Sequence, residues 1–251
     1  MTVIAVGSWR GLGTSTTALL LAAAAALRTA DVWLVEADPA GGVLASRAPD
    51  LAGVDSLGRV AFIAHDGPVD QTLASAARPL AGVHVLTAPW DSFQAWSAVA
   101  SPRRPWIEGL RRLGGIVIID VGSLRGGEVP VWPVIERADV LAMVTSPDPA
   151  ALASTVAWMD AKGQSAPGVG GLSLDTARLV VVDCPVAAGE RFDAHVASEL
   201  GERLVGWWPW EAKVVDHVLR GGSLDHRSVR RCDLPGAASA TLDRLLDGAV
   251  R

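Results

Sequence analysis

The sequence predicts a three-layer α/β fold in which helices cover both faces of a mostly parallel β-sheet. Two observations predict it. Short apolar runs that suit strands alternate with helix candidates along the chain, as in folds built from strand–helix–strand units. Several of these runs are unbroken rather than alternately polar, which is typical of strands buried on both faces. With 251 residues the chain is long enough for a substantial core, and we expect residues 1–251 to form a single domain.

The first third of the chain opens with a strand, a glycine-containing turn and a helix. Val3–Val6 predicts a buried strand, and Ala18–Leu27 predicts a long helix rich in alanine and leucine. A second buried strand is expected at Asp31–Glu36. Further expected elements are short strands at Val60–Ala64 and Val83–Leu86, with a helix at Val69–Ala77 between them.

The rest of the chain repeats the alternation. Trp90–Ala100 and Pro102–Leu113 are expected helices, because Pro102 suits a first helical turn and Ser101 suits its cap. Residues 115–119 form an apolar run that ends in Asp120. The remaining expected elements are helices at Val131–Glu136, Pro149–Asp160, Phe192–Leu200, Val214–Arg220 and Ala237–Asp247, strands at Val140–Val144, Arg178–Val182 and Leu204–Trp208, and a loop at Gly163–Gly171.

The turn at residues 7–17 has the shape of a phosphate-binding loop. A strand, a glycine turn and a helix N-terminus bind anions because free backbone N–H groups and the helix dipole point the same way. A working loop has a glycine, four residues and then Gly-Lys-Ser/Thr. Here Gly13 and the hydroxyl of Ser15 are present, but Thr14 stands at the lysine position. Lysine is rare in this chain, yet a general preference for arginine would place arginine at residue 14, so the loop has lost its charge.

Two acids follow predicted strands near this turn. Ligands of parallel α/β sheets bind beyond the carboxyl ends of the strands, so Asp38 is expected on the side of the loop. Asp120 ends an apolar strand, where nucleotide-binding folds place the acid that holds magnesium. The residue types alone leave plainer readings open. The glycines can serve only the tight turn, Ser15 and Thr16 only a helix cap, and the two acids only solvated loops.

Five segments, taken in order, resemble the MinD/ParA family of deviant phosphate-loop ATPases over nearly the whole chain. The family's Lys-Gly-Gly-Val-Gly-Lys-Thr-Thr is similar to residues 9–16, and its Val-Asp-Xaa-Asp-Pro-Gln is similar to residues 35–40. The other similar segments are residues 118–122, 138–147 and 206–222. The resemblance implies a P-loop NTPase-like fold.

The resemblance also implies a nucleotide site with ATP and magnesium as the possible cofactors. Magnesium would be held by Ser15 and Asp120, and Asp38 would be the catalytic acid if the protein is active. The nucleotide-binding residues that it implies are Gly11, Gly13, Thr14, Ser15, Thr16 and Asp120.

The chain departs from the family at residues that the reaction needs. Both family lysines are absent, since Thr14 and Trp9 stand in their places, and Arg10 replaces a loop glycine. The family's first acid of the second motif is Glu36, and its base-recognising asparagine is Asp183. Losing one charged transition-state contact costs on the order of 10²- to 10³-fold in rate. The sequence therefore favours a protein that does not hydrolyse ATP.

Three functions are compatible with this pattern. The first is a catalytically degenerate interaction and positioning module, a homodimer that binds protein partners in a larger septal, pilus or secretion assembly. The alternative is a nucleotide-dependent switch or weak ATPase that uses the atypical loop. A DNA-partition protein is the third, although the net charge of −5 argues against general nucleic-acid binding.

Tryptophan and arginine mark candidate partner surfaces, because both are enriched at binding hot spots. The candidates are Trp9, Arg10, Trp207, Trp208 and Trp210. A second group is Trp90, Trp96 and Trp106, near Arg103 and Arg104. The two cysteines predict neither a disulfide framework nor a metal cluster. The longest apolar run is too short to cross a bilayer, so we expect a cytoplasmic protein without an integral membrane segment.

Overall fold

The computed structural model describes residues 1–53, 56–63, 69–100, 105–125, 128–163, 177–183 and 200–249. These residues form one eight-stranded sheet in the order β3-β4-β2-β5-β1-β6-β7-β8. Within the described sheet only β3 is antiparallel to its neighbour, and every other pair is parallel. The strands are β1 Thr2–Ser8, β2 Val32–Glu36, β3 Arg78–Leu80, β4 Val83–Leu86, β5 Ile116–Ser123, β6 Val140–Thr145, β7 Ala177–Val182 and β8 Leu204–Trp208.

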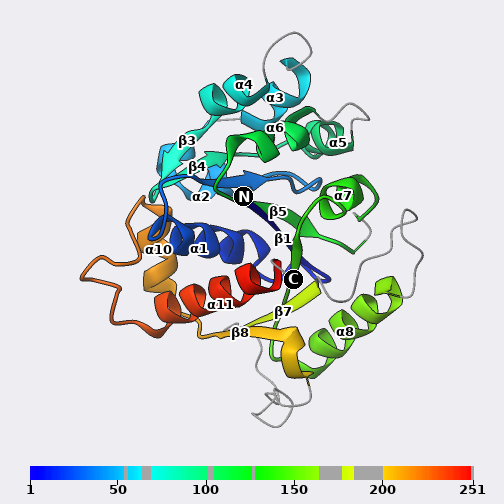
Figure 1. The fold of residues 1–251 in the computed structure, drawn as a ribbon, viewed down its shortest axis with the longest axis vertical. Coiled ribbons are helices and arrows are strands. Elements are labelled where there is room, and N and C mark those ends of the chain that lie inside the picture. Colours follow the sequence, from blue (N-terminus) through cyan, green and yellow to red (C-terminus); the bar gives the residue numbers. More distant parts are fainter. Residues whose placement is uncertain are drawn as a thin grey trace.

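Helices cover both faces of the sheet, which confirms the predicted three-layer architecture (Figure 1). Alternate residues of β1 show the two faces: Ile4 and Val6 pack into one buried cluster, and Val3 and Ala5 into the other. The first cluster includes α1 Thr14–Ala26, α2 Leu44–Arg47, η1 Pro49–Leu51, α10 Ala212–Leu219 and α11 Asp233–Ala249. The second includes α3 Ser56–Ile63, α4 Val69–Ala76, α5 Ser92–Ala100, α6 Pro105–Leu113, α7 Glu128–Ile135 and α8 Pro149–Gly163. A short turn, η3 Gly201–Arg203, precedes β8.

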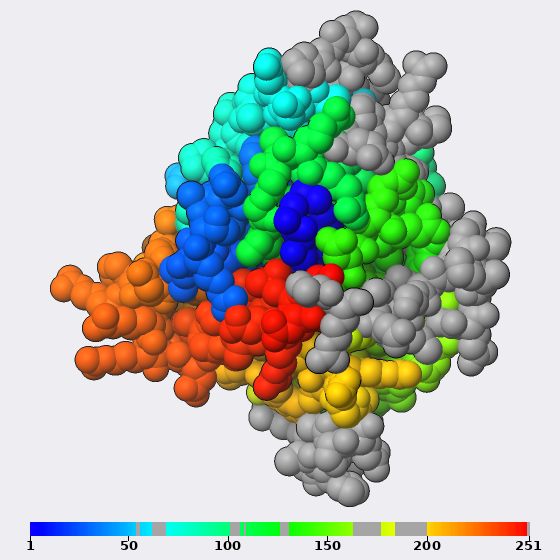
Figure 2. All heavy atoms as spheres, viewed as in Figure 1, coloured from blue at the N-terminus to red at the C-terminus, as the bar shows by residue number. Residues whose placement is uncertain are grey.

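The first helix, α1, is buried around its whole circumference. Every residue from Thr17 to Ala25 is buried, and α1 packs on β5 from one side and α11 from the other. Figure 1 shows α1 in blue directly alongside α11 in red, and on the surface in Figure 2 blue N-terminal residues lie against the red C-terminal segment. The many alanines make this possible, because a small side chain lets neighbouring elements approach closely. As a result α1 is held firmly at the centre of one layer.

Two local expectations are corrected by the structure. Residues 60–64 were expected to form a strand, but Ser56–Ile63 is helix α3. Leu57, Val60 and Ala61 are all buried, and their spacing of three and four residues fits one face of a helix. The edge strand β3 was not expected; it is only three residues long and contains Pro79, which edge strands tolerate.

The other elements agree in kind with the prediction, with shifted ends. The first helix begins at Thr14 rather than Ala18, so the whole Thr-Ser-Thr-Thr run is helical. The C-terminal helix begins at Asp233, one turn before the expected start. The predicted helix at 192–200 and the predicted loop at 163–171 lie almost entirely outside the described residues.

Candidate functional site

A cavity of about 240 Å³ opens at the carboxyl ends of β1, β2 and β5. The glycine-containing turn after β1 forms one wall, and the segments that follow β2 and β5 form the others. The residues that line it are Gly11, Gly13, Thr14, Ser15, Thr16, Asp38, Val43, Arg47, Gly122 and Ser123. The structure therefore brings together six of the residues singled out from the sequence, at the edge where such sheets bind ligands.

The loop is closed on itself by the hydroxyl of Ser8. This oxygen accepts hydrogen bonds from the backbone N–H groups of Gly11 (2.7 Å) and Leu12 (3.2 Å) and from the hydroxyl of Thr14 (2.9 Å). Ser8 is fully buried and Thr14 is 5% exposed. Gly11 and Gly13 have φ values of 72° and 75°, which glycine adopts without strain. The loop thus directs two of its N–H groups at its own side chain.

The N-terminus of α1 remains available beside this closed loop. Gly13 precedes the helix, and no side chain caps it. The first N–H with a backbone partner is that of Thr17, which donates to Gly13 (2.9 Å). The N–H groups of residues 14–16 make no hydrogen bond to the described part of the chain, as expected for a first helical turn. They and the helix dipole favour a negative charge at this point.

Glu36 is fully buried at the end of β2, where it holds the next segment in place. One carboxylate oxygen accepts the N–H groups of Val43 (2.7 Å) and Leu44 (2.9 Å), and the other accepts the N–H of Ala88 (3.0 Å). Burial raises the pKa of Glu36, and the three backbone donors oppose that shift. Glu36, which stands at the position of the family's first acid, therefore fixes the start of α2 through these hydrogen bonds.

Asp120 lies beside Glu36 on the adjacent strand and is completely buried. Burial raises its pKa to about 8, and the nearby carboxylates of Glu36 and Asp38 add to the shift, while Ser15 opposes it. One oxygen accepts the N–H of Gly122 (3.0 Å), and the other has no hydrogen-bond partner in the described structure.

This unpartnered oxygen tests whether the residues fit the magnesium ion that the resemblance implies. Magnesium is usually held by one or two carboxylates, phosphate oxygens and water. A carboxylate oxygen without a partner next to the Ser15 hydroxyl fits such a site. Among the described residues, no group of three or more His, Cys, Asp or Glu could hold a metal ion on its own.

Asp38 faces the same cavity from the loop after β2. Its carboxylate accepts the N–H of Ala40 (2.8 Å) and lies against the backbone of Gly122, whose φ is 67°. Burial raises the pKa of Asp38. The contact works only because residue 122 lacks a β-carbon, so the Asp-Val-Gly-Ser sequence that ends β5 is part of the site.

Arg47 is the charged residue of this cavity that the sequence reasoning missed. It is the last residue of α2, and its guanidinium donates to the hydroxyl of Thr16 on α1 (3.0 Å). The motif pattern marks residues within the loop, whereas Arg47 reaches the cavity from a separate helix, α2. A basic residue soon after the Asp38 motif was the only available signal.

Trp9 and Arg10, at the start of the loop, point away from the cavity and contact α8. The guanidinium of Arg10 donates to the Ser154 hydroxyl (3.4 Å), and the ring of half-buried Trp9 lies 5.9 Å from that of Trp158. Arg10 does not line the cavity, so it does not replace the lysine charge in this structure.

The tryptophans near β8 divide into core and surface. Trp208 is 1% exposed, and its indole N–H donates to Thr241 (2.8 Å), so the structure removes it from the predicted partner surface. Its position in a buried strand explains the error. Trp207 is half-buried, and Trp210 is 43% exposed.

The second tryptophan group divides in the same way. Trp106 is fully buried and its indole N–H donates to the carbonyl of Ala98 (3.2 Å). Trp90 is 85% exposed and Trp96 is 44% exposed. Arg103 and Arg104 lie outside the described residues.

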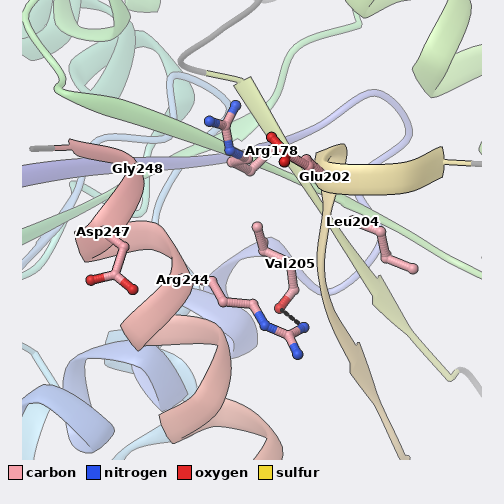
Figure 3. Close-up of a pocket in the computed structure, with 7 residues that line it drawn as sticks. All are labelled: Arg178, Glu202, Leu204, Val205, Arg244, Asp247 and Gly248. Carbon is pink, nitrogen blue, oxygen red and sulfur yellow. Dashed lines mark hydrogen bonds between the residues drawn. The ribbon is translucent and has the colours of Figure 1, made fainter. Parts of the chain in front are cut away.

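A second cavity, of about 280 Å³, lies at the opposite end of the sheet, where β7 and β8 begin (Figure 3). Its lining residues are Arg178, Glu202, Leu204, Val205, Arg244, Asp247 and Gly248. Arg244 donates to the carbonyl of Val205 (3.0 Å). Because the amino ends of parallel strands are not the usual ligand edge, the cavity beside the loop is the stronger candidate.

Comparison with solved structures identifies the fold. The chain is similar to the cell-division ATPase MinD of Pyrococcus furiosus, with a TM-score of 0.73, 16% identity and 98% of each chain covered. It is also similar to a ParA family ATPase from Chlorobium tepidum, with a TM-score of 0.71, 18% identity and coverage of 100% of this chain and 99% of that one. The chain has the MinD/ParA fold.

A third similar structure is the MinC:MinD cell-division complex of Aquifex aeolicus, with a TM-score of 0.65, 16% identity and coverage of 98% of this chain and 96% of that one. No protein-family profile and no curated protein matches the sequence. The MinD/ParA fold is therefore recognised through its three-dimensional arrangement and through short motifs. Within the described residues, no helix is long and apolar enough to cross a membrane.

Proposed function

We propose that this chain is a non-hydrolysing member of the MinD/ParA fold that serves as an interaction and positioning module. The observation that carries the proposal is the loop closed by Ser8, whose hydroxyl takes the N–H groups of Gly11 and Leu12 and the hydroxyl of Thr14. In a working loop, backbone N–H groups cradle phosphates and a lysine neutralises their charge. Here the N–H groups of Gly11 and Leu12 are engaged by Ser8 and the lysine is absent.

The absence of the loop lysine affects ATP hydrolysis more than it affects folding. Phosphoryl transfer is catalysed almost entirely by positioning and by neutralising charge on the phosphate oxygens. Thr14 is a buried neutral residue, and the Arg10 guanidinium donates to Ser154 on α8. Neither side chain supplies a cation to the loop, which supports binding functions over turnover.

The proposed partners are proteins of a larger assembly, of the septal, pilus or secretion type. The fold is compatible with such a role, because a MinD of the same fold is known in complex with MinC. We also propose that the chain forms a homodimer, with the surface around half-buried Trp9 and exposed Arg10 near the interface. Light scattering of the purified chain tests the oligomeric state.

The test of the proposed function is restoration of turnover. The wild-type protein is expected to show no magnesium-dependent ATP hydrolysis above that of Asp38→Asn, which controls for contaminating enzymes. The double substitution Ser8→Gly and Thr14→Lys removes the hydroxyl from the loop and returns the cation, and we expect it to bind magnesium-ATP more tightly. Hydrolysis by the wild type that Asp38→Asn abolishes would contradict the proposal.

A further inference from the structure

The cavity is lined by one arginine, Arg47, that lies outside both the loop at residues 7–17 and the segment at residues 35–40. Arg47 lines it from α2 and donates to the Thr16 hydroxyl (3.0 Å), and Thr16 belongs to the first turn of α1. This contact joins a guanidinium to the helix end whose N–H groups at residues 14–16 have no partner in the described chain. A positive charge and free amide donors therefore lie side by side at one wall of the cavity.

The charge of Arg47 is not neutralised by its described surroundings. Its guanidinium forms no ion pair with any described carboxylate, although Asp38 lines the same cavity, and Thr16 is its only described hydrogen-bond partner. A guanidinium presents several N–H donors in a planar fork that matches phosphate oxygens. Most of these donors are still available here.

Arg47 is held in this position by Glu36. The buried carboxylate of Glu36 accepts the N–H groups of Val43 and Leu44, which begin the segment that Arg47 ends. The approach is tight, because a β-carbon on Gly42 would lie 2.5 Å from a Glu36 oxygen. The short helix α2 is thereby fixed to the end of β2 and projects Arg47 over the cavity.

We propose that Arg47 is the cation of a phosphate-binding site displaced from the closed loop to the mouth of the cavity. A phosphate group would lie between the Arg47 guanidinium, the Thr16 hydroxyl and the free amides of α1, and Glu36 is a positioning residue for Arg47. The ligand is a phosphate-bearing molecule, either a nucleotide or an inorganic polyphosphate. This inference rests on the proposed function in one respect: the ligand is held and is not consumed.

Calorimetry with three probes tests the site: ATP, ADP and inorganic tripolyphosphate, each with and without magnesium. We expect the wild-type protein to bind at least one probe, and Arg47→Gln to weaken that binding at least tenfold. Arg78→Gln is the matched control, because Arg78 is also exposed and also donates a hydrogen bond, to the carbonyl of Ala77, but lies on β3 and does not line the cavity. It is expected to bind like the wild type. Equal binding by tripolyphosphate and ATP identifies the phosphate chain as the recognised group, and binding of nucleotides alone identifies a nucleotide.

Two results would overturn the inference: no binding of any probe at millimolar concentration, or binding by Arg47→Gln equal to that of the wild type. ATP turnover is measured in the same samples. Turnover by the wild type contradicts the proposed function but leaves the dependence on Arg47 intact, whereas loss of binding alone leaves the proposed function intact. The two failures are therefore distinguishable.

The positioning role of Glu36 is tested by a double-mutant cycle. If Glu36 acts through Arg47, the Glu36→Gln and Arg47→Gln double variant binds no more weakly than Arg47→Gln alone, and both variants lose the salt dependence of wild-type binding to the same extent. If Glu36 had only a structural role, Glu36→Gln would lower the free energy of unfolding, and its effect on binding would not depend on whether Arg47 is present. Additive losses in the double variant would refute the positioning role.

Discussion

The carboxylate of Asp38 occupies the space that a β-carbon on Gly122 would need. An ideal β-carbon there would lie 2.1 Å from the carboxyl carbon of Asp38 and 2.3 and 2.5 Å from its two oxygens. This close approach joins the segment after β2 to the end of β5. It also fixes one acidic wall of the cavity without any hydrogen bond between the two residues.

Gly122→Ala is expected to destabilise the protein by about 2 to 4 kcal/mol, because it combines a steric clash with a φ of 67° that alanine avoids. Denaturant unfolding measures the change. Gly13→Ala is the control, since its φ is 75° but nothing lies within 4 Å of the added carbon, and it should cost only about 1 kcal/mol. Adding Asp38→Ala to Gly122→Ala should recover the difference between them. Equal losses for the two alanine substitutions would contradict the proposed clash.

The buried carboxyl of Asp120 gives the protein a pH-dependent stability. Its pKa is raised from 3.8 to about 8, so the folded state retains a proton that the unfolded state has lost between these values. The free energy of unfolding should therefore fall as pH rises from about 4 to 8 and then level off. Asp120→Asn should reduce this slope, leaving the part that the raised pKa values of Glu36 and Asp38 contribute, and should stabilise the protein at pH 8 by about 1 to 3 kcal/mol.

The measurement for Asp120→Asn is the free energy of unfolding at several values from pH 5 to pH 9. Asp243→Asn serves as the control, because Arg28 lowers the pKa of Asp243 and moves its effect to acid pH. A slope that persists unchanged in Asp120→Asn would show that another group is responsible.

Trp208→Phe is expected to destabilise the protein by about 2 kcal/mol, because it removes the hydrogen bond to Thr241 and leaves a void in a fully buried position. Trp210→Phe, on an exposed residue of the same segment, should change stability by less than about 0.5 kcal/mol. Thermal and denaturant unfolding provide the comparison. Similar costs for the two variants would argue against the packing of Trp208 described above.

The layers of the fold were predictable because each buried strand is an apolar run with a clear end. Residues 115–119 lead into Asp120, and Val3–Val6 leads into the glycine turn, so both strands and their order beside helices follow from the sequence. Residues 60–64 were wrongly assigned because a short apolar run fits a strand or a helix equally well by composition. Only the burial of Leu57, three residues before Val60, distinguishes the two.

Half of the candidate site could be predicted and half depends on contacts between distant segments. The glycines of the loop and Asp38 stand at positions that motifs mark. The bond between Ser8 and Thr14 and the bond between Arg47 and Thr16 cannot be read from spacing, since each requires the side chains to be placed in three dimensions. Trp208 shows the converse limit, because its residue type favoured a surface while its strand placed it in the core.

The packing of α1 against α11 also constrains how the chain folds during synthesis. The first helix is apolar on every side, and its partner comes from Asp233–Ala249, so nearly the whole described chain separates the two. During synthesis, the apolar helix α1 would therefore remain uncovered until α11 leaves the ribosome. Such surfaces promote aggregation of incomplete chains, so assistance by a chaperone that binds apolar segments would matter most for the layer that carries the cavity.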